Sequence, residues 1–574
     1  MEYRIKGGNE GANIRVENER EVGGVLYFDV KLTFDGEEIP EPFKVSFDFP
    51  SIDIYSIWSP SVRYDRHIGP SWRKKVTESR LASWMPLHTL LSADGRNRVA
   101  VTLSDAKTPT SIATGVHEHS ALFTYEISFF TVKVAPLHEY VATVRVDRRD
   151  IPYYDAIYDA VEWWENECGY VPAHVPEHAK LPMNSLWYSY HQDLNPDEIV
   201  KECALSKPLG MDTVIVDDGW QTYDLGRGYI TCGDWEMSPA KFPDMKNFVD
   251  RVHALGMKVM LWYSVPFIGI EAKNFERFKD MVLDECANGK TVFVFDPRYK
   301  EVREYLISIY TKAVREWELD GLKLDFIDSF ALKGKSLEYD ARRDYQSLED
   351  AVDVLMTDVH NALAEINPEI MIEFRQSYVG PAIRKYGNML RVADCPNDSY
   401  RNRHNIINLR LTSGKTAVHS DMIMWHRDDK VESAALQVVS TLFGIPQISV
   451  VIEKLPEDHK KMLAFYLGFW RENRDTLIEG KLLAANPESA YSIACSEKDG
   501  KAVFVSYTDT LVDCTAYSEI CAVNASRSKN LLIKGAIGKA YTVYNCMGEE
   551  LAAGVIYSAI SEIAIPLSGL IKIK

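Results

Sequence analysis

The sequence has no uninterrupted run of about 18 apolar residues, the length that a membrane-spanning helix needs. Its start, MEYRIKGGNE, also lacks the apolar core of a secretory signal. We therefore expect a cytoplasmic protein with no membrane partner.

Paired cysteines are missing as well. The nine cysteines are odd in number and scattered, no Cys-x-x-Cys occurs, and Cys514 and Cys521 are the closest pair. This pattern shows no zinc framework and indicates reduced thiols in the core. We expect neither a metal ion nor a cofactor.

Positive charge is scarce relative to negative charge. The 65 lysines and arginines are outnumbered by 83 aspartates and glutamates, which gives a formal net charge of −18. This balance argues against nucleic acid as a partner. The 574 residues are too many for one core and suggest two to four domains.

The first part of the chain, residues 1–165, reads as all-β. Strand-like runs occur at 25–34, 99–103, 121–130 and 140–146, and Asp35-Gly36 predicts a turn after the first of them. These features predict a β-sandwich. It could be a lid, a binding module or a packing partner for the next domain. A helix over 153–170 and a Pro-rich linker, placed at 166–183, come next.

From residue 184 to about 480 the pattern changes to strands that alternate with helices. Candidate strands are 184–190, 213–217, 258–262, 321–326, 370–375, 389–394, 417–420 and 445–450. Candidate helices are 196–209, 245–255, 299–318, 345–366, 434–442 and 455–475. This order predicts a (β/α)8 TIM barrel. A doubly wound sheet is the alternative, but no Gly-x-Gly-x-x-Gly follows any strand. Short β runs in 481–574 predict a C-terminal antiparallel β domain, in which the run 563–567, with Pro566, can only be an edge strand.

Four of the predicted barrel strands end in acid. Asp217 and Asp218, Asp325, Glu373 and Asp394 stand at or near these ends, and Lys323 lies just before Asp325. In a parallel barrel the C-terminal strand ends meet at one mouth, where catalytic groups lie. We therefore expect these carboxylates to form one site, although a structural pair of Lys323 with Asp325 would also explain the charge.

Two carboxyl groups at one mouth suit glycoside cleavage. A separation of about 5–5.5 Å gives retention of configuration, and about 6.5–9.5 Å gives inversion. Aromatic residues that could serve as sugar platforms lie near the predicted strand ends. They are Trp187, Tyr188, Trp220, Trp235, Trp262, Tyr263 and Tyr378, of which we expect one or two to be structural.

The order of several motifs resembles the barrel of the α-galactosidases of glycoside hydrolase family 36, which shares a clan with family 27. The motifs are Ile215-Val-Asp-Asp-Gly-Trp220, Cys232-Gly-Asp-Trp-Glu236, Lys241-Phe-Pro243, His253-Ala-Leu-Gly-Met-Lys258 and Leu261-Trp262. The resemblance covers about residues 184–425. Oligomers are frequent in that family, so a homo-oligomer is possible.

The resemblance implies roles for individual residues. Asp325 in Lys323-Leu-Asp325 would be the nucleophile, and Asp394 in Arg391-Val-Ala-Asp394 would be the acid/base, with Asp398 in reserve. Residues expected to bind or line the sugar site are Asp217 and Asp218 (at the 4- and 6-hydroxyls), Lys323, Arg391 (near the 2-hydroxyl), Trp262, Trp220, Glu373, Arg375, Asp398 and His191.

One segment departs from the family pattern. Where the family has a small, glycine-rich turn, this chain has Glu373-Phe-Arg-Gln-Ser-Tyr-Val-Gly380. Arg375 could contact a sugar hydroxyl, pair with an anionic sugar group, or be held by Glu373 or Asp394. The identity of the sugar is therefore left open.

Charge arguments add two expectations. Asp325 should be ionised, because Lys323 lies on the same face of the strand. Asp394 should have a raised pKa through burial and a neighbouring carboxylate.

The sequence thus predicts a retaining exo-α-glycosidase, in particular an α-galactosidase that acts on oligosaccharides or other glycosides. Alternatives are a glycosidase for N-acetylgalactosamine or an anionic or modified sugar, and a carbohydrate-binding protein without turnover. A further alternative is a Mg²⁺-dependent lyase or isomerase with the ion among Asp217, Asp218, Asp325 and Glu373, where Lys323 would compete with the ion.

Overall fold

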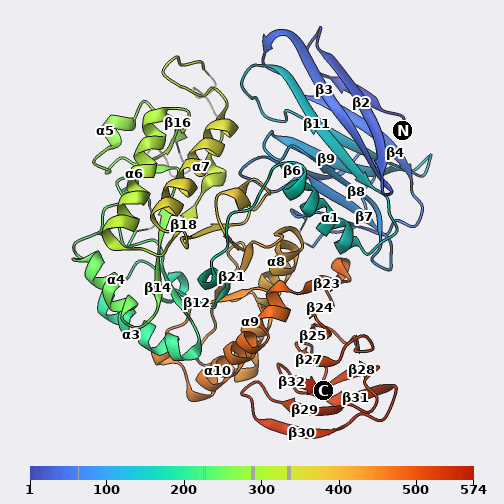
Figure 1. The fold of residues 1–574 in the computed structure, drawn as a ribbon, viewed down its shortest axis with the longest axis vertical. Helices are drawn as coiled ribbons and strands as arrows, with labels where there is room; N and C mark the ends of the chain where they lie inside the picture. The colour runs from blue at the N-terminus through green and yellow to red at the C-terminus, as the bar shows by residue number, and fades with distance from the viewer. Residues whose placement is uncertain (63, 224, 227, 286–290, 333–337) are drawn as a thin grey trace.

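A computed structural model describes residues 1–62, 64–223, 225–226, 228–285, 291–332 and 338–574 (Figure 1). It has three parts: a β-sandwich, a closed barrel of parallel strands with helices around it, and a C-terminal pair of sheets. The predicted fold class is confirmed.

The N-terminal sandwich consists of a five-stranded and a six-stranded antiparallel sheet. The first has the order β1 (Arg4–Gly7), β4 (Phe43–Pro50), β10 (Leu122–Phe129), β9 (Thr110–His117) and β6 (Lys75–Ser79). The second has the order β2 (Asn13–Val22), β3 (Val25–Glu38), β11 (Leu137–Asp147), β8 (Asn97–Leu103), β7 (Leu87–Leu91) and β5 (Ser56–Trp58). Alternate residues of β3 such as Phe28, Val30 and Leu32 fill the core between the sheets.

The predicted turn at Asp35-Gly36 is wrong. β3 continues through these two residues to Glu38, and its pairing with β11 shifts register between Leu137 and Glu139. A bulge absorbs the turn-forming pair within a long strand.

The barrel contains all eight predicted strands in the predicted order. They are β12 (Met183–Ser185), β13 (Thr213–Val216), β14 (Lys258–Ser264), β18 (Gly321–Asp325), β19 (Met371–Arg375), β20 (Met389–Arg391), β21 (Ala417–Ile423) and β22 (Ile445–Ile448). The first is shorter than predicted, because the helical turn α2 (Trp187–Tyr190) replaces its second half. β20 is also shorter than the predicted 389–394, and β21 is longer than the predicted 417–420. Gly321 begins β18 where a Cβ would lie 2.6 Å from the Met371 carbonyl oxygen, so the close approach of these strands requires glycine.

Helices surround the barrel as predicted, with one addition. The chain forms α3 (Pro196–Ser206), α4 (Met245–His253), α6 (Lys300–Trp317), α7 (Leu348–Ile366), α8 (Ser399–Thr412), α9 (Val431–Val439) and α10 (Glu457–Glu472), while α1 (Tyr153–Asn166) precedes the barrel. The sequence did not predict α8. Its residues from Asn402 to Thr412 are buried on every side, including the polar ones, so no amphipathic stripe marks it.

Three further sheets complete the described chain. A small sheet of β15 (Phe267–Gly269), β17 (Val292–Phe295) and β16 (Val282–Glu285) lies between β14 and β18 and was not predicted. The larger C-terminal sheet has the order β23 (Lys481–Ala485), β24 (Ile493–Lys498), β25 (Lys501–Ser506), β27 (Glu519–Asn524), β32 (Leu570–Ile573), β29 (Ala540–Tyr544) and β30 (Glu550–Val555). Beside it, β26 (Leu511–Asp513), β28 (Asn530–Lys534) and β31 (Ile560–Ala564) form a three-stranded sheet. The pairs β25/β27 and β26/β28 are parallel, and the other pairs are antiparallel. β31 is an edge strand, as predicted, but it ends before Pro566.

Among the described residues, no helix has the length and apolar character to cross a membrane. The eight described cysteines carry free thiols, seven of them buried.

Candidate active site

Asp325 ends β18 at the mouth of the barrel and is surrounded by donors. Trp262 Nε1 donates to its Oδ2 at 3.0 Å, whereas Oδ1 accepts from Arg375 Nε at 2.6 Å, from the backbone N–H of Phe326 at 2.8 Å and from the Tyr378 hydroxyl. Phe326 adopts a left-handed conformation (φ 66°) directly after the strand, and its N–H thereby meets the carboxylate beside it. Asp325 is thus held rigidly.

These contacts decide the charge of Asp325. Burial alone would raise the pKa of Asp325, but the charges of Arg375 and Lys323, with the hydrogen bonds from Tyr378 and Trp262, hold that pKa well below its usual range. Asp325 is ionised, as predicted. The larger charge effect comes from Arg375, since Lys323 itself pairs with a different carboxylate.

That carboxylate is Asp217, directly after β13. Lys323 Nζ lies 2.5 Å from Asp217 Oδ2, and both side chains are buried. The structural pair considered from the sequence, Lys323 with Asp325, is therefore replaced by a pair that joins β18 to the end of β13 across the intervening strand β14. Asp217 Oδ1 also accepts the backbone N–H of Asp218 at 2.9 Å.

Asp218 is held by two amide side chains. Gln192 Nε2 donates to its Oδ2 and Gln221 Nε2 to its Oδ1, both at 2.7 Å. Burial, with a smaller effect of the Asp217 charge, raises the pKa of Asp218 to about 6 despite these donors.

Arg391, at the end of β20, is the centre of a buried ion cluster. Its Nη2 donates to Asp394 Oδ1 at 2.8 Å, its Nη1 donates to Asp421 Oδ1, and its Nε lies 3.7 Å from Glu373 Oε1. Glu373 also accepts from Gln447 Nε2. Arg391 is fully buried between these carboxylates. Arg391 thus supports Asp394 and connects that residue to strands β19 and β21.

Asp394 itself is open to solvent. Its side chain is 53% exposed, while Arg391 holds one of its oxygens. The predicted rise in its pKa is wrong: burial opposes ionisation, but the charges of Arg391, Arg375 and Lys323 outweigh it and lower the pKa of Asp394. Arg375 and Lys323 lower the pKa of both Asp325 and Asp394, so the two carboxyl groups lie near the same cations.

Asp398 has a structural place. It is the N-cap of α8, where its Oδ1 accepts the backbone N–H of Arg401 at 2.9 Å, and it is exposed. Capping of the helix accounts for the aspartate at position 398, so a catalytic role is not needed to explain it.

Most of the aromatic residues predicted as sugar platforms are buried in the core. Trp220, Trp235, Trp262, Tyr263 and Tyr378 are all buried, so more of the predicted platforms are structural than expected. Trp220, predicted to line the sugar site, is fully buried, and its Nε1 donates to the Trp262 carbonyl at 2.9 Å.

Among the predicted site residues, three partly exposed side chains follow β12: Trp187, Tyr188 and His191. His191 stacks on Trp187 with ring centroids 4.6 Å apart and an interplanar angle of 12°. All three follow the end of β12, and a role of His191 in lining the sugar site stays a prediction.

Sequence reasoning missed the contribution of the N-terminal sandwich. Arg80 donates from Nη2 to the Asp328 carbonyl at 2.6 Å and from Nη1 to the Phe330 carbonyl at 2.9 Å. The backbone N–H of Trp84 donates to the Ser377 carbonyl at 2.8 Å. The loop of residues 80–84 thus supports both loops that carry the donors of Asp325. No local pattern in the sequence signals such a long-range contact.

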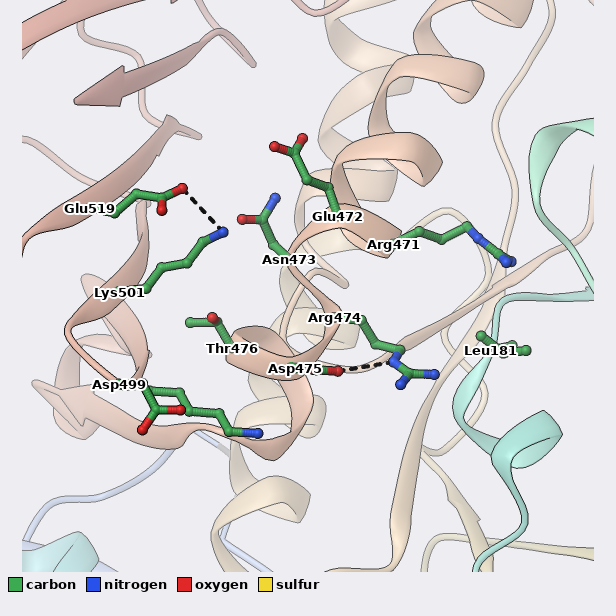
Figure 2. Close-up of a pocket in the computed structure, with 11 residues that line it drawn as sticks. Leu181, Arg471, Glu472, Asn473, Arg474, Asp475, Thr476, Asp499, Lys501 and Glu519 are labelled. Atoms are coloured by element: carbon green, nitrogen blue, oxygen red, sulfur yellow. Dashed lines mark hydrogen bonds and ion pairs between the residues drawn. The ribbon is translucent and has the colours of Figure 1, made fainter. Parts of the chain in front are cut away.

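The hollow in Figure 2 lies elsewhere. It has a volume of about 660 Å³ and is lined by residues at the end of α10 and by the C-terminal sheet, with Leu181 beside it. Leu181 precedes β12, so this hollow is near the amino ends of the strands, opposite the mouth. Its cations are paired, for example Lys501 with Glu519 at 3.2 Å.

The proposed magnesium ligands have other partners. Asp217 contacts Lys323, Asp218 two amides, Asp325 an arginine and a tyrosine, and Glu373 a glutamine. Lys323 and Arg375 already pair with Asp217 and Asp325 and would repel a cation bound among these acids, so the four residues do not fit Mg²⁺.

Comparisons with known proteins agree with this geometry. The family model of the melibiases matches residues 177–480. Among characterised proteins, α-galactosidase Mel36A of Lactobacillus acidophilus is 26% identical over 144 residues, which are 24% of this chain and 20% of that protein. The A type blood α-D-galactosamine galactosaminidase of Flavonifractor plautii is 22% identical over 192 residues, 30% of this chain and 17% of that protein. These matches span about a fifth of the length of the relatives.

Solved structures share the whole fold. The α-galactosidase of Lactobacillus brevis has a TM-score of 0.66 at 13% identity, covering 100% of this chain and 85% of that one. The family-36 α-galactosidase AgaA of Geobacillus stearothermophilus, in complex with raffinose, has a TM-score of 0.65 at 15% identity, covering 100% and 86%. The resemblance to family 36 is therefore confirmed, and since the matching family model covers more than half of the chain, this protein belongs to the melibiase family.

Proposed function

We propose that this protein is a retaining exo-α-glycosidase that releases terminal α-galactosyl groups from oligosaccharides. The observation that carries this proposal is the contrast between its two carboxyl groups. Asp325 is buried, ionised and held in place by four donors, which suits a nucleophile that must also depart, whereas Asp394 is open to solvent and anchored through one oxygen.

In the first step Asp325 attacks the anomeric carbon while the bond to the leaving oxygen breaks and Asp394 gives that oxygen its proton. In the second step Asp394 takes a proton from water, the water oxygen bonds to the anomeric carbon, and the bond to Asp325 breaks. Arg391 keeps Asp394 in position for both proton transfers.

The remaining strand-end groups bind the sugar in this proposal. Asp217 and Asp218 follow β13, Lys323 lies on β18, and together they offer acceptors and a donor for adjacent hydroxyls. A neutral sugar fits better than an anionic one, because the charge of Arg375 already pairs with Asp325. The substrates in complexes of relatives, raffinose and stachyose, are neutral oligosaccharides that support this choice.

The test is hydrolysis of a panel of nitrophenyl α-glycosides with and without EDTA. We expect turnover of the α-galactoside, with an initial product of α configuration and no effect of EDTA. Turnover of the α-N-acetylgalactosaminide or a uronide alone would keep the mechanism and change the sugar. Loss of activity with EDTA would contradict the proposal.

Asp325→Ala tests the nucleophile directly. We expect turnover to be abolished, and added azide to restore cleavage with a β-galactosyl azide as product. Near-normal activity of Asp325→Ala without azide would refute the assignment.

A further inference from the structure

The two oxygens of the Asp325 carboxylate have unequal surroundings. Oδ1 accepts from three donors: the Phe326 N–H at 2.8 Å, Arg375 Nε at 2.6 Å and the Tyr378 hydroxyl. Oδ2 accepts only from Trp262 Nε1, at 3.0 Å, among the described residues. A carboxylate oxygen has about two lone-pair sites, so Oδ1 is saturated and Oδ2 retains the capacity to form a bond.

Arg375 and Tyr378 are themselves firmly placed. The guanidinium of Arg375 lies over the rings of Phe326 and Tyr378, with its carbon 5.1 and 5.6 Å from their centroids. Tyr378 is fully buried, and burial together with the Asp325 charge raises its pKa well above the usual value, so it stays a donor. Neither side chain can swing away without leaving a buried group unpaired.

The turn that carries both residues is braced on two sides. The Gln376 N–H donates to the Arg391 carbonyl at 2.9 Å, and its Oε1 accepts the Ala393 N–H at 3.0 Å, which ties it to the segment of Asp394. On the other side, the Trp84 carbonyl lies 2.5 Å from where a Cβ on Gly380 would be, so the sandwich loop packs directly against the turn. This is the segment in which the sequence departs from the family pattern.

We propose that Arg375 and Tyr378 are a positioning pair that makes Oδ2 of Asp325 the attacking oxygen and promotes departure of Asp325 in the second step. The proposal rests on the proposed function. When water attacks the anomeric carbon, the electron pair of the breaking C1–Oδ2 bond returns to the Asp325 carboxylate. The charge of Arg375 and the hydrogen bond from Tyr378 stabilise that charge as it forms.

This role has a kinetic signature. A carboxylate stabilised in this way is a weaker nucleophile and a better leaving group, so the pair accelerates the second step more than the first. Without it, the glycosyl-enzyme should accumulate, and kcat and KM should fall together. A purely structural defect would instead lower kcat/KM and leave no intermediate.

The experiment compares wild type, Tyr378→Phe and Tyr310→Phe on 2,4-dinitrophenyl α-galactoside by stopped flow. Tyr310 is the matched control, because it is buried and its hydroxyl has no partner among the described residues. For Tyr378→Phe we expect kcat to fall about tenfold to a hundredfold, the loss of one hydrogen bond to a charged group, with a parallel fall in KM. A burst of dinitrophenol equal to the enzyme concentration should appear in this variant and not in Tyr310→Phe.

Arg375→Met and Arg375→Lys extend the test and serve if Tyr378→Phe does not fold. We expect a burst with the methionine variant and partial recovery of kcat with the lysine variant, which restores the charge. Variants of Arg375 and Tyr378 with wild-type kinetics, or with reduced kcat/KM and no burst, would refute the positioning role of this pair and leave the proposed function intact. A wild type that hydrolyses no α-glycoside would overturn the proposed function, and the pair with it.

Discussion

The guanidinium of Arg391 donates to Asp394 from one nitrogen and to Asp421 from another, so a single buried cation joins the exposed acid to strand β21. Asp421 is fully buried and also accepts the Tyr188 hydroxyl at 2.9 Å and the Cys395 N–H at 2.5 Å. The position of Asp394 therefore depends on the buried Asp421, which lies on a different strand. This relationship also sets the protonation of Asp394.

The first prediction concerns pH. In the proposed mechanism Asp394 must be protonated for the first step, and its pKa is lowered by Arg391 and other cations against the effect of burial. Above that pKa the protonated fraction falls tenfold per pH unit, so kcat/KM for an alkyl α-galactoside should decline steadily as pH rises from 5 to 8. A dinitrophenyl galactoside needs no proton on its leaving group.

The measurement is the ratio of the two kcat/KM values against pH. Protonation of Asp218, with its pKa of about 6, affects both substrates and cancels in the ratio. We expect the kcat/KM of the alkyl substrate, divided by that of the dinitrophenyl substrate, to fall over the whole range from pH 5 to 8. A ratio that stays constant up to pH 7 would mean that the pKa of Asp394 is raised instead.

The second prediction is that Asp421→Asn impairs the acid selectively. Without the Asp421 charge, Arg391 loses one of its carboxylate partners and the anchor of Asp394 loosens. We expect kcat/KM for the alkyl galactoside to fall about tenfold to a hundredfold, with a much smaller change for the dinitrophenyl substrate. Steady-state assays on both compounds measure this.

Breaking a buried pair also costs stability, about 3–5 kcal/mol, so this variant needs a control. Asp353→Asn provides one, since Asp353 accepts from Tyr386, Lys107 and Lys385 at a distance from the site. It should lower the Tm without changing the ratio between the substrates. An equal loss on both substrates in Asp421→Asn would show that Asp421 does not act through Asp394.

The third prediction concerns the indole that holds Oδ2. Trp262→Phe removes the donor of the 3.0 Å hydrogen bond to Asp325, and Oδ2 loses its fixed direction. We expect kcat/KM to fall about tenfold to a hundredfold. Trp235→Phe is the matched control, because the Trp235 nitrogen is buried without a partner among the described residues. Equal losses of kcat/KM in the two variants would show that the effect comes from packing and not from the hydrogen bond to Asp325.

Much of the fold could be predicted because its signals are local. Strands such as β13 and β18 are apolar runs of the right length, and acids follow them where the barrel opens. Asp217, Asp325 and Asp394 were found in this way. By contrast, α8 was missed because it is covered on all sides: Arg66 of the sandwich donates to its Asn408 at 2.9 Å.

The contacts within the site could not be predicted, because they join distant segments. The family resemblance implied that Arg391 binds sugar. An arginine at a strand end carries no sign of which carboxylates surround it. Its partners come from strands β19 and β21 and from its own loop, and the register of the barrel brings them together. In the same way, nothing near Asp325 indicates that Tyr378, 53 residues later, donates to it.

The fourth prediction lies outside the site and concerns Glu202 on α3. This buried carboxylate accepts the Ile452 N–H at 2.7 Å, and burial raises its pKa to about 7 despite that bond. Because the folded state holds the proton more tightly than the unfolded chain, the free energy of unfolding falls as pH rises from the ordinary pKa of a glutamate to the raised pKa of Glu202. Relative to low pH, where Glu202 is protonated in both states, the free energy of unfolding is lower by about 3 kcal/mol at pH 8 and by less than about 1 kcal/mol at pH 5.

Glu202→Gln removes the titrating group and should therefore raise the Tm relative to wild type by several degrees more at pH 8 than at pH 5. Comparing the two pH values cancels any constant effect of the amide on the Ile452 contact. Glu198→Gln, an exposed change on the same helix, should alter the Tm equally at both pH values. Thermal unfolding by calorimetry measures all three proteins. A Tm difference between Glu202→Gln and wild type that does not depend on pH would show that Glu202 is ionised in the folded protein at pH 5 already.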